Sequence, residues 1–398
     1  MTTLMLLSDD LSFLYGPIDN FTSLVWCEKY TECGSFTLML PMSRELFAVL
    51  QSSAYLSVSG RPGLGRVERI RFSADASGTN GVGTLTVSGR MAESLLSDRM
   101  ILRGTRAKGE LVSCVETVVK ENACADAGER ALPYLTIGAG EALLDSSGTE
   151  YTVDDAPGGQ ALDEWVRSVL SEVGAAYRIL PDYAAGQLVF SVYRGLDRTP
   201  SQNVNGCAVF SSSFASVGEM EFVSDKSDYK NFAFIAGEGE GDARIIETLD
   251  LRAAGEPLRE LYVDARDLRS DDGETVLDEA SYRKLLLARG RQRLSEHNHV
   301  LTLEGSAAVY AAGETAAEEM LSADTLPPIG AVLGPSMRAG VDYALGDLCG
   351  IASDALGAVW EERITEITYT YEGTRCIVAP RFGVSYPDLR TLLKRREE

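Results

Sequence analysis

The chain has 398 residues, with 37 basic and 59 acidic side chains and a formal net charge of −22. A nucleic-acid-binding surface needs clustered Lys and Arg, so this balance argues against a protein that grips DNA or RNA. The length exceeds what one hydrophobic core usually serves, which predicts two or more domains.

Residues 1–104 predict a first β domain with two short helices. Apolar and polar residues alternate over 34–40, which is typical of a strand with one buried face. Ser43 is expected to cap the first helix, and the second is expected just after Arg90. The apolar start lacks a basic flank, so no signal peptide is expected, and no apolar run approaches the roughly 20 residues that cross a bilayer.

Residues 105–205 predict an α+β insertion domain. Apolar residues at i, i+3 and i+4 spacing predict two amphipathic helices, over 110–122 and from about 162 to 173. Two strands, 176–180 and 187–193, are then expected to form a hairpin.

Strand-like sequence returns over 206–250, which predicts the first part of a second β domain. Residues 251–299 predict a helical continuation of the insertion. The rest of the second β domain is expected over 300–386, with an irregular Ala- and Gly-rich insert at 306–338, and a short charged helix over 387–398. The predicted class is α+β, mainly β.

The two ends of the chain repeat one order of elements. Each has a short strand, a Gly-centred turn, a strand that contains a Glu-Arg-Ile step, and a closing strand. The step is Glu68-Arg69-Ile70 in the first copy and Glu362-Arg363-Ile364 in the second. Four elements in the same order predict a duplicated β module, which favours a part of a symmetric assembly over an enzyme.

Two segments superficially suggest ligand binding. Gly237-Glu238-Gly239-Glu240-Gly241 resembles a phosphate loop, but it lacks the Lys-Ser/Thr pair and carries two carboxylates, so a turn is favoured. The acidic stretch 264–279 suggests calcium, but with Gly273 at the sixth position of an EF-hand loop the first ligand would be Leu268. A solvated loop is the better interpretation.

The search for catalytic and metal-binding groups gives no candidate. His297 and His299 are the only histidines and would share one face of a strand, but no Cys or acidic cluster nearby completes a metal site. Acidic pairs such as Asp154-Asp155 and Asp163-Glu164 are expected by chance among 59 carboxylates. No Gly-x-Ser-x-Gly elbow is present. The sequence therefore predicts no catalytic, metal-binding or cofactor-binding residues, and no cofactor.

The cysteines number seven, are widely scattered, and include no Cys-x-x-Cys pair. This pattern favours reduced thiols over a disulfide framework or a zinc site, and assembly in a cytoplasm. They are Cys27, Cys33, Cys114, Cys124, Cys207, Cys349 and Cys376.

A series of short stretches in collinear order, spanning nearly the whole chain, points to a family. The stretches are 24–30 with 34–41, 85–90 with 94–96 and Arg99, 231–241 with Arg244, 263–268, 287–290 and 340–347. Together they resemble the tail-hub proteins of long-tailed phages, the siphovirus-type tail protein family also found in prophages and phage tail-like particles.

The resemblance implies a homotrimeric baseplate hub at the tip of a virion or tail-like particle. Each chain would give two tube-forming β-barrel-like domains, related by duplication, to a ring with the insertions outside. Six such domains would join a hexameric tail tube or distal tail ring to a trimeric spike, needle or fibre. The tape measure protein is a further possible partner. The insert at 306–338 departs from the short connection expected of the family.

The acidic balance predicts that carboxylates line the channel, so that DNA passes without specific binding. Electrostatic forces reach only about 8 Å at physiological salt, so these charges would have to lie on the wall itself. Two alternatives stay open. One is a peptidoglycan or glycan hydrolase at the tail tip, and the other is a glycan-binding tail module, which would need exposed aromatic side chains.

Overall fold

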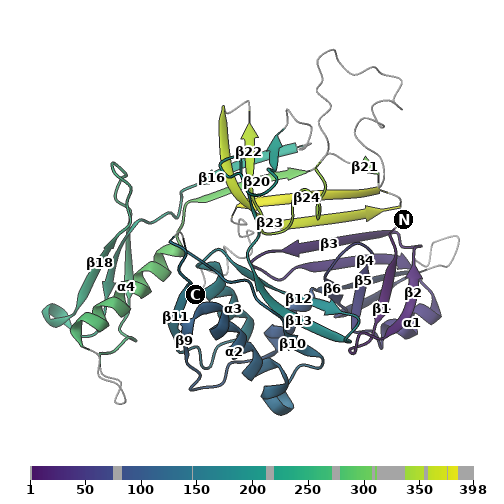
Figure 1. Ribbon diagram of the computed structural model, residues 1–398, viewed down its shortest axis with the longest axis horizontal. Helices are drawn as coiled ribbons and strands as arrows, with labels where there is room; N and C mark the ends of the chain where they lie inside the picture. Colours follow the sequence, from purple (N-terminus) through teal and green to yellow (C-terminus); the bar gives the residue numbers. More distant parts are fainter. Residues whose placement is uncertain are drawn as a thin grey trace. The chain divides into compact units, whose positions relative to one another are not determined.

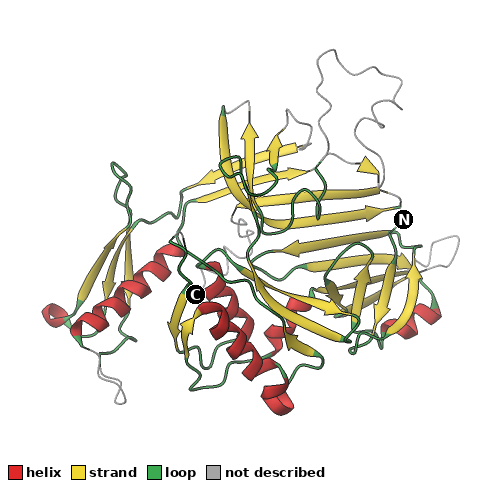
Figure 2. Ribbon diagram, in the orientation of Figure 1, coloured by secondary structure: helices red, strands yellow, loops and turns green. Residues whose placement is uncertain are grey.

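The computed structural model describes residues 2–74, 83–145, 147–211, 219–270, 278–306, 310–311, 337–353, 357–373 and 375–383 (Figure 1). The described residues form both helices and strands, with more residues in strands than in helices, which confirms the α+β, mainly β class (Figure 2). The chain forms two compact units, Met1–Met220 with Glu304–Phe382, and Glu221–Leu303 with Gly383–Glu398. The expected helix at 387–398 and nearly all of the expected insert at 306–338 lie outside the described residues.

A long sheet organises unit 1. Its main path has the strand order β16-β20-β24-β23-β3-β4-β8-β7, and β16 and β20 run across the boundary into unit 2. The strands are β3 (Ser23–Lys29), β4 (Ser35–Pro41), β7 (Arg69–Ser73), β8 (Thr84–Arg90), β16 (Glu219–Asp225), β20 (Val300–Ser306), β23 (Ala358–Glu372) and β24 (Arg375–Gly383).

Alternation of side chains gives this sheet one covered face. In β4, Phe36, Leu38 and Leu40 are buried while the residues between them are exposed, as the sequence predicts. A Cβ on Gly65 would lie 2.5 Å from the Phe36 ring, so only glycine allows the neighbouring backbone to approach this closely.

A smaller sheet of order β2-β1-β5-β6 also belongs to unit 1. Its strands are β1 (Leu4–Leu7), β2 (Phe13–Ile18), β5 (Tyr55–Val58) and β6 (Leu64–Arg66). Helix α1 (Arg44–Leu50) begins at the expected cap, where the Ser43 side chain accepts the Leu46 N–H. The second expected helix is the 3-10 helix η1 (Ala92–Asp98).

The segment between the two β regions is α+β, as the sequence predicts. Helix α2 (Leu111–Ala123) is capped by Glu110, and helix α3 (Leu162–Ser171) buries Trp165 and Val166. The expected hairpin is formed by the antiparallel strands β12 (Ala176–Asp182) and β13 (Gln187–Tyr193). The strands are β9 (Ala107–Glu110), β10 (Leu135–Ile137), β11 (Thr152–Asp155), β12 (Ala176–Asp182) and β13 (Gln187–Tyr193), with the 3-10 helix η2 (Ala125–Arg130) between β9 and β10.

Short strands complete unit 1 beside the main path. Strand β22 (Leu348–Ser353) pairs antiparallel with β23, and parallel with both β14 (Asp197–Arg198) and β15 (Val209–Ser211). Strand β21 (Tyr310–Ala311) pairs with β24.

Unit 2 contains a three-stranded sheet and one helix. Strand β17 (Phe232–Ala236) lies between β18 (Ile246–Asp250), which is antiparallel to it, and β19 (Glu260–Asp264), which is parallel. Helix α4 (Glu279–Ser295) packs on this sheet, and the 3-10 helix η4 (Gly241–Ala243) precedes β18. The strands that the sequence groups with the second β domain thus share a core with the helix that it assigns to the insertion.

Candidate functional site

Eight strands of the long sheet form two groups with the same internal order. When the strands of each group are numbered in chain order, both groups have the spatial order first, second, fourth, third: β3-β4-β8-β7 and β16-β20-β24-β23. The groups meet where β23 pairs antiparallel with β3 over 366–372 and 23–29. Within the described residues, β7 and β16 end the path, so each leaves one edge open.

The two Glu-Arg-Ile steps occupy matching places in these groups. Arg66 pairs with Tyr55 in the small sheet and Arg69 with Ser88 in the long sheet, so the chain changes sheets at Glu68. In β23, the residues through Arg363 pair with β22, and those from Ile364 onward pair with β24. Both steps therefore mark the point where a strand leaves one partner for the next.

The surroundings of the two steps differ. Hydrogen bonds from Arg90, whose Nη2 lies 2.7 Å from Glu68 Oε1, lower the pKa of Glu68. Burial instead raises the pKa of Glu362, and the Arg363 guanidinium lies 5.5 Å from the centre of the Tyr30 ring. The positions match in topology but not in chemistry.

The junction of β23 with β3 shows what a completed contact between groups looks like. On the covered face, Tyr369 lies opposite Trp26 and both are buried. On the other face, Lys29 Nζ lies 3.7 Å from Glu366 Oε2. An apolar contact on one face and an ion pair on the other thus join the two groups.

The open edge of β7 has the same two kinds of side chain without a partner strand. Phe72 lies opposite the fully buried Leu85, on the covered face, yet 50% of it is exposed. Arg69 and Arg71 point to the other face and are exposed. The edge strand β16 alternates in the same way, with Glu221 exposed and its neighbour Phe222 half-buried. These edges are the candidate functional site.

The face of the long sheet opposite the covered one is rich in hydroxyl groups. Its described residues on six strands, assigned by register with the buried side chains, include six cations and two carboxylates. They are Ser23, Val25, Cys27, Lys29, Ser35, Thr37, Met39, Pro41, Arg69, Arg71, Ser73, Thr84, Thr86, Ser88, Arg90, Glu366, Thr368, Thr370, Glu372, Arg375, Ile377, Ala379 and Arg381.

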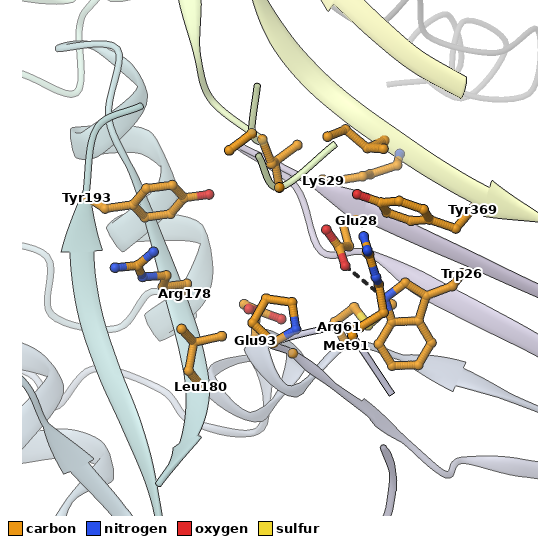
Figure 3. Close-up of a pocket in the computed structure, with 18 of the residues that line it drawn as sticks. Trp26, Glu28, Lys29, Arg61, Met91, Glu93, Arg178, Leu180, Tyr193 and Tyr369 are labelled. Carbon is orange, nitrogen blue, oxygen red and sulfur yellow. Dashed lines mark hydrogen bonds between the residues drawn. The ribbon is translucent and has the colours of Figure 1, made fainter. Parts of the chain in front are cut away.

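A cavity of about 230 Å³ lies beside the internal junction (Figure 3). Five parts of unit 1 contribute to its lining: β3, the turn between β5 and β6, the start of η1, the β12–β13 hairpin, and β23 with the loop that precedes β22. The lining includes Trp26, Glu28, Arg61, Glu93, Tyr193 and Tyr369.

Two glutamates in this cavity are half-buried. Glu93 accepts the Ile179 N–H at 3.1 Å, and Glu28 accepts the Trp26 indole N–H at 3.0 Å. Burial raises the pKa of both carboxyls. The volume is below the roughly 300–1,000 Å³ of ordinary small-molecule sites, so these groups fit a structural role better than cleavage of a polymer.

Residues 237–241 and the two histidines, which superficially suggest ligand binding, have structural contacts. Residues 237–241 connect β17 with β18, and the Tyr282 hydroxyl accepts the Glu238 N–H, so a turn is confirmed there. His297 Nδ1 lies 2.8 Å from Asp228, whereas His299 Nε2 lies 2.8 Å from the Ser224 hydroxyl. No group of three metal-ligating side chains occurs in the described parts of the chain.

The acidic pairs serve local structure. Asp155 accepts the Trp165 indole N–H at 2.8 Å, and Asp154 pairs with Lys108. Asp163 lies 3.9 Å from Arg167 on the same helix. Residues 271–277 of the acidic stretch lie outside the described residues. All seven cysteines are free thiols.

Among the described residues, no helix is both long and apolar enough to span a bilayer.

Comparisons with known proteins identify a family. A family model described as "Siphovirus ReqiPepy6 Gp37-like protein" matches residues 3–384. The fold is similar to the tail protein from Neisseria meningitidis MC58, with a TM-score of 0.53 and 12% identity over 96% of this chain and 95% of that one. It is also similar to the 43 kDa tail protein of prophage MuSo2 from Shewanella oneidensis, with a TM-score of 0.53 and 13% identity over 96% and 97%. Comparison with curated proteins gave no match. The resemblance to phage tail proteins is confirmed.

Proposed function

We propose, from the premise that the chain belongs to the Siphovirus ReqiPepy6 Gp37-like family, that it is a structural tail-hub protein which forms a trimeric, pseudo-sixfold ring. The observation that carries this proposal is the repeated strand order with two open edges. The ring joins a hexameric tail tube to a trimeric spike or needle at the tail tip. The distal tail ring, a fibre and the tape measure protein are further partners of the same assembly.

The open edges suggest how one chain meets the next. Inside the chain, the third strand of one group pairs with the first strand of the other, as β23 does with β3. The same rule applied between chains pairs β7 of one copy with β16 of the next. Such a head-to-tail contact closes into a ring when the rotation per copy allows it, and three chains with two groups each give six positions.

Side chains at the two edges complement each other. Arg71 of β7 would meet Glu221 of β16 on one face, and Phe72 would meet Phe222 on the other. The internal junction combines an ion pair with two buried aromatic residues that lie opposite each other in the register. A second copy of this chain is therefore the occupant that fits the edge.

The hydroxyl-rich face of the long sheet would line the channel, because the opposite face is covered by the chain itself. On β3, β4, β7, β8, β23 and β24 its described residues include more cations than carboxylates, and Glu221 of β16 would add a carboxylate to this face. The expectation that carboxylates line the channel stays a prediction. A wall without a dense array of cations lets DNA pass without specific binding.

The remaining assignments rest on the same ring. The two four-strand groups would be the duplicated tube domains, with β9–β13 outside the ring. We propose no enzymatic activity, because Glu28 and Glu93 of the described cavity serve as hydrogen-bond acceptors for the Trp26 indole and the Ile179 backbone. The protein would assemble in the host cytoplasm and remain at the tail tip.

A charge swap at the edge tests this function. The full chain is expected to be a trimer by native mass measurement, with sixfold-like density in electron microscopy. Arg71→Glu alone and Glu221→Arg alone should each weaken the trimer, and the double variant should restore it. Val204→Asp, at a residue that is 86% exposed and lies on neither edge strand, is the control. A dimer, or a trimer that neither single variant affects, would contradict the proposal.

A further inference from the structure

The three-stranded sheet of unit 2 has two unlike faces. Helix α4 packs on one of them, where Ile235 and Val263 contact Tyr282 and Leu286 in a buried cluster. No helix in the described part of unit 2 packs on the other face. Successive residues of a strand alternate between faces, so the residues next to this core point to the uncovered side.

Aromatic side chains occupy the middle of the uncovered face. Phe232 and Phe234 lie on the central strand β17, with ring centres 5.0 Å apart in an edge-to-face arrangement. Tyr262 on β19 lies opposite Phe234 in the register, and 61% of it is exposed. Ile246 on β18 is 51% exposed. The face is thus an aromatic surface open to solvent within this unit.

Tyr262 is held in place although it is exposed. Arg244 donates from Nη1 to the Tyr262 hydroxyl at 3.0 Å, and from Nη2 to Asp264 at 2.8 Å. The same guanidinium also donates to the carbonyl oxygens of Ala236 and Gly237, both at 3.0 Å. A ring fixed in this way loses little side-chain freedom when a ligand stacks on it, which favours binding.

Polar groups around the rings are fixed in pairs. Arg252 donates to both oxygens of Asp250, and Arg266 does the same to Asp264. These arginines hold the pKa of each aspartate at about 2, so both pairs stay charged at neutral pH. With Glu260 and Arg244 included, three carboxylates face three guanidinium groups. The face has no net charge to attract a polyanion or a polycation.

The size of the face limits what it can hold. Three strands about 4.8 Å apart and five residues of about 3.4 Å each give an area near 14 by 17 Å. A stable protein partner needs roughly 800 Å² on each side, about three times this area. Two or three sugar rings match it.

We propose that this face binds a neutral saccharide of two or three sugar units, in the manner of a host-surface glycan. Sugar rings present apolar C–H faces that stack on aromatic rings and hydroxyl groups that bond to fixed carboxylates and guanidinium groups. Tyr262 and Phe234 supply the stacking surface, and the pairs at Asp250 and Asp264 supply the hydrogen bonds. The inference stands apart from the ring, because it uses only residues of unit 2.

Calorimetric titration and saturation-transfer NMR of the full chain with chitotriose and maltotriose test this site. The wild-type chain is expected to bind at least one of the two with a dissociation constant near 1 mM, and Tyr262→Ala should weaken that binding at least about tenfold. Tyr262→Phe keeps the ring and should retain most of the affinity. Tyr183→Ala removes a tyrosine of similar exposure, 57%, from unit 1 and is the matched control.

Several outcomes would overturn the proposal. One is the absence of binding to either trisaccharide, and another is equal binding by the wild type and Tyr262→Ala. A change of oligomeric state in Tyr262→Ala would assign the face to a protein contact instead. Circular dichroism of each variant checks the fold, and Tyr262→Phe keeps the test valid should the alanine variant unfold.

Discussion

The internal junction of β23 with β3 and the open edge of β7 are two versions of one arrangement. At the junction, Tyr369 and Trp26 are buried against each other and Lys29 pairs with Glu366. At the edge, Phe72 is half exposed, and the described residues include no second strand beside β7, which pairs only with β8. The same chemistry stabilises the fold in one place and remains available for assembly in the other. An exposed aromatic in an otherwise covered row therefore marks an unfinished interface.

Removing the aromatic at the completed junction should have the largest effect. Trp26 is fully buried, so Trp26→Ala creates a cavity and leaves the Glu28 carboxyl without its donor. We expect a loss of about 3–5 kcal/mol in the free energy of unfolding, measured by urea denaturation. Phe13→Ala, at a residue that is 59% exposed, should change it by less than about 1 kcal/mol. Equal effects of the two substitutions would contradict the comparison.

The matching substitution at the open edge should act on assembly instead. Phe72→Ala is expected to leave the unfolding of the isolated chain within about 1 kcal/mol of wild type, because half of the side chain is already in water. In the proposed ring, the same substitution should weaken each interface by about 2 kcal/mol of binding free energy. Sedimentation would then show the variant trimer dissociating at protein concentrations at which the wild-type trimer stays intact. If Phe72→Ala strongly lowered the free energy of unfolding but left the trimer intact, the β7 edge would serve the fold and not assembly, which would contradict the comparison.

The Glu93 carboxyl in the cavity beside the junction gives a smaller, pH-dependent effect. Burial raises the pKa of Glu93 in the folded chain above its ordinary value of 4.5. Above pH 4.5 the folded state then binds more protons than the unfolded state, so this group lowers stability as the pH rises through that window. Glu93→Gln should therefore be more stable than wild type at pH 7, by about 1 kcal/mol, and nearly equal to it at pH 4.

Urea unfolding at the two pH values measures this difference. The amide oxygen of the glutamine still accepts the Ile179 N–H, so the variant tests the charge and not the hydrogen bond. Glu164→Gln, an exposed glutamate on α3, is the control and should change stability by less than about 0.5 kcal/mol. A variant that is less stable at pH 7 would show that the ionised carboxylate is favourable here.

The ion pair of the junction should contribute least. Lys29 and Glu366 are 3.7 Å apart and partly exposed, so Lys29→Ala should cost no more than about 1 kcal/mol of unfolding free energy. Arg71→Ala should have no effect on the unfolding of the single chain, but it should make the proposed trimer more sensitive to salt. Thermal unfolding and sedimentation at two salt concentrations separate these effects.

Local patterns in the sequence predict the local structure well. Ser43 and Glu110 begin helices where capping and periodicity place them. Strand β22 begins only at Leu348, because Asp347 accepts backbone N–H groups from Ala344 and Leu196 and holds the preceding loop. A side chain that bonds to backbone from a distant segment leaves no periodic signal.

Long-range pairing is what the sequence does not show. The contact of β23 with β3 joins residues more than 300 positions apart, and alternation within each strand says nothing about its neighbour. The sequence also does not show that Phe72 is exposed, because its exposure depends on which strands lie beside β7. The repeated Glu-Arg-Ile step was the one sequence signal of this long-range order, because its two copies mark matching positions in β6–β7 and in β23. Phe232, Phe234 and Tyr262 also read as ordinary strand residues, and only the placement of α4 shows which face they occupy.

Strand β23 has a mechanical consequence. Its 15 residues bond to β22, β24 and β3, so one continuous segment of backbone ties the two four-strand groups to the small strands beside them. Antiparallel ladder bonds lie perpendicular to the strand, and a pull along β23 therefore strains many of them at once. A tensile force on the C-terminal half of unit 1 would be shared across this ladder, whereas a peeling force would break its bonds one by one.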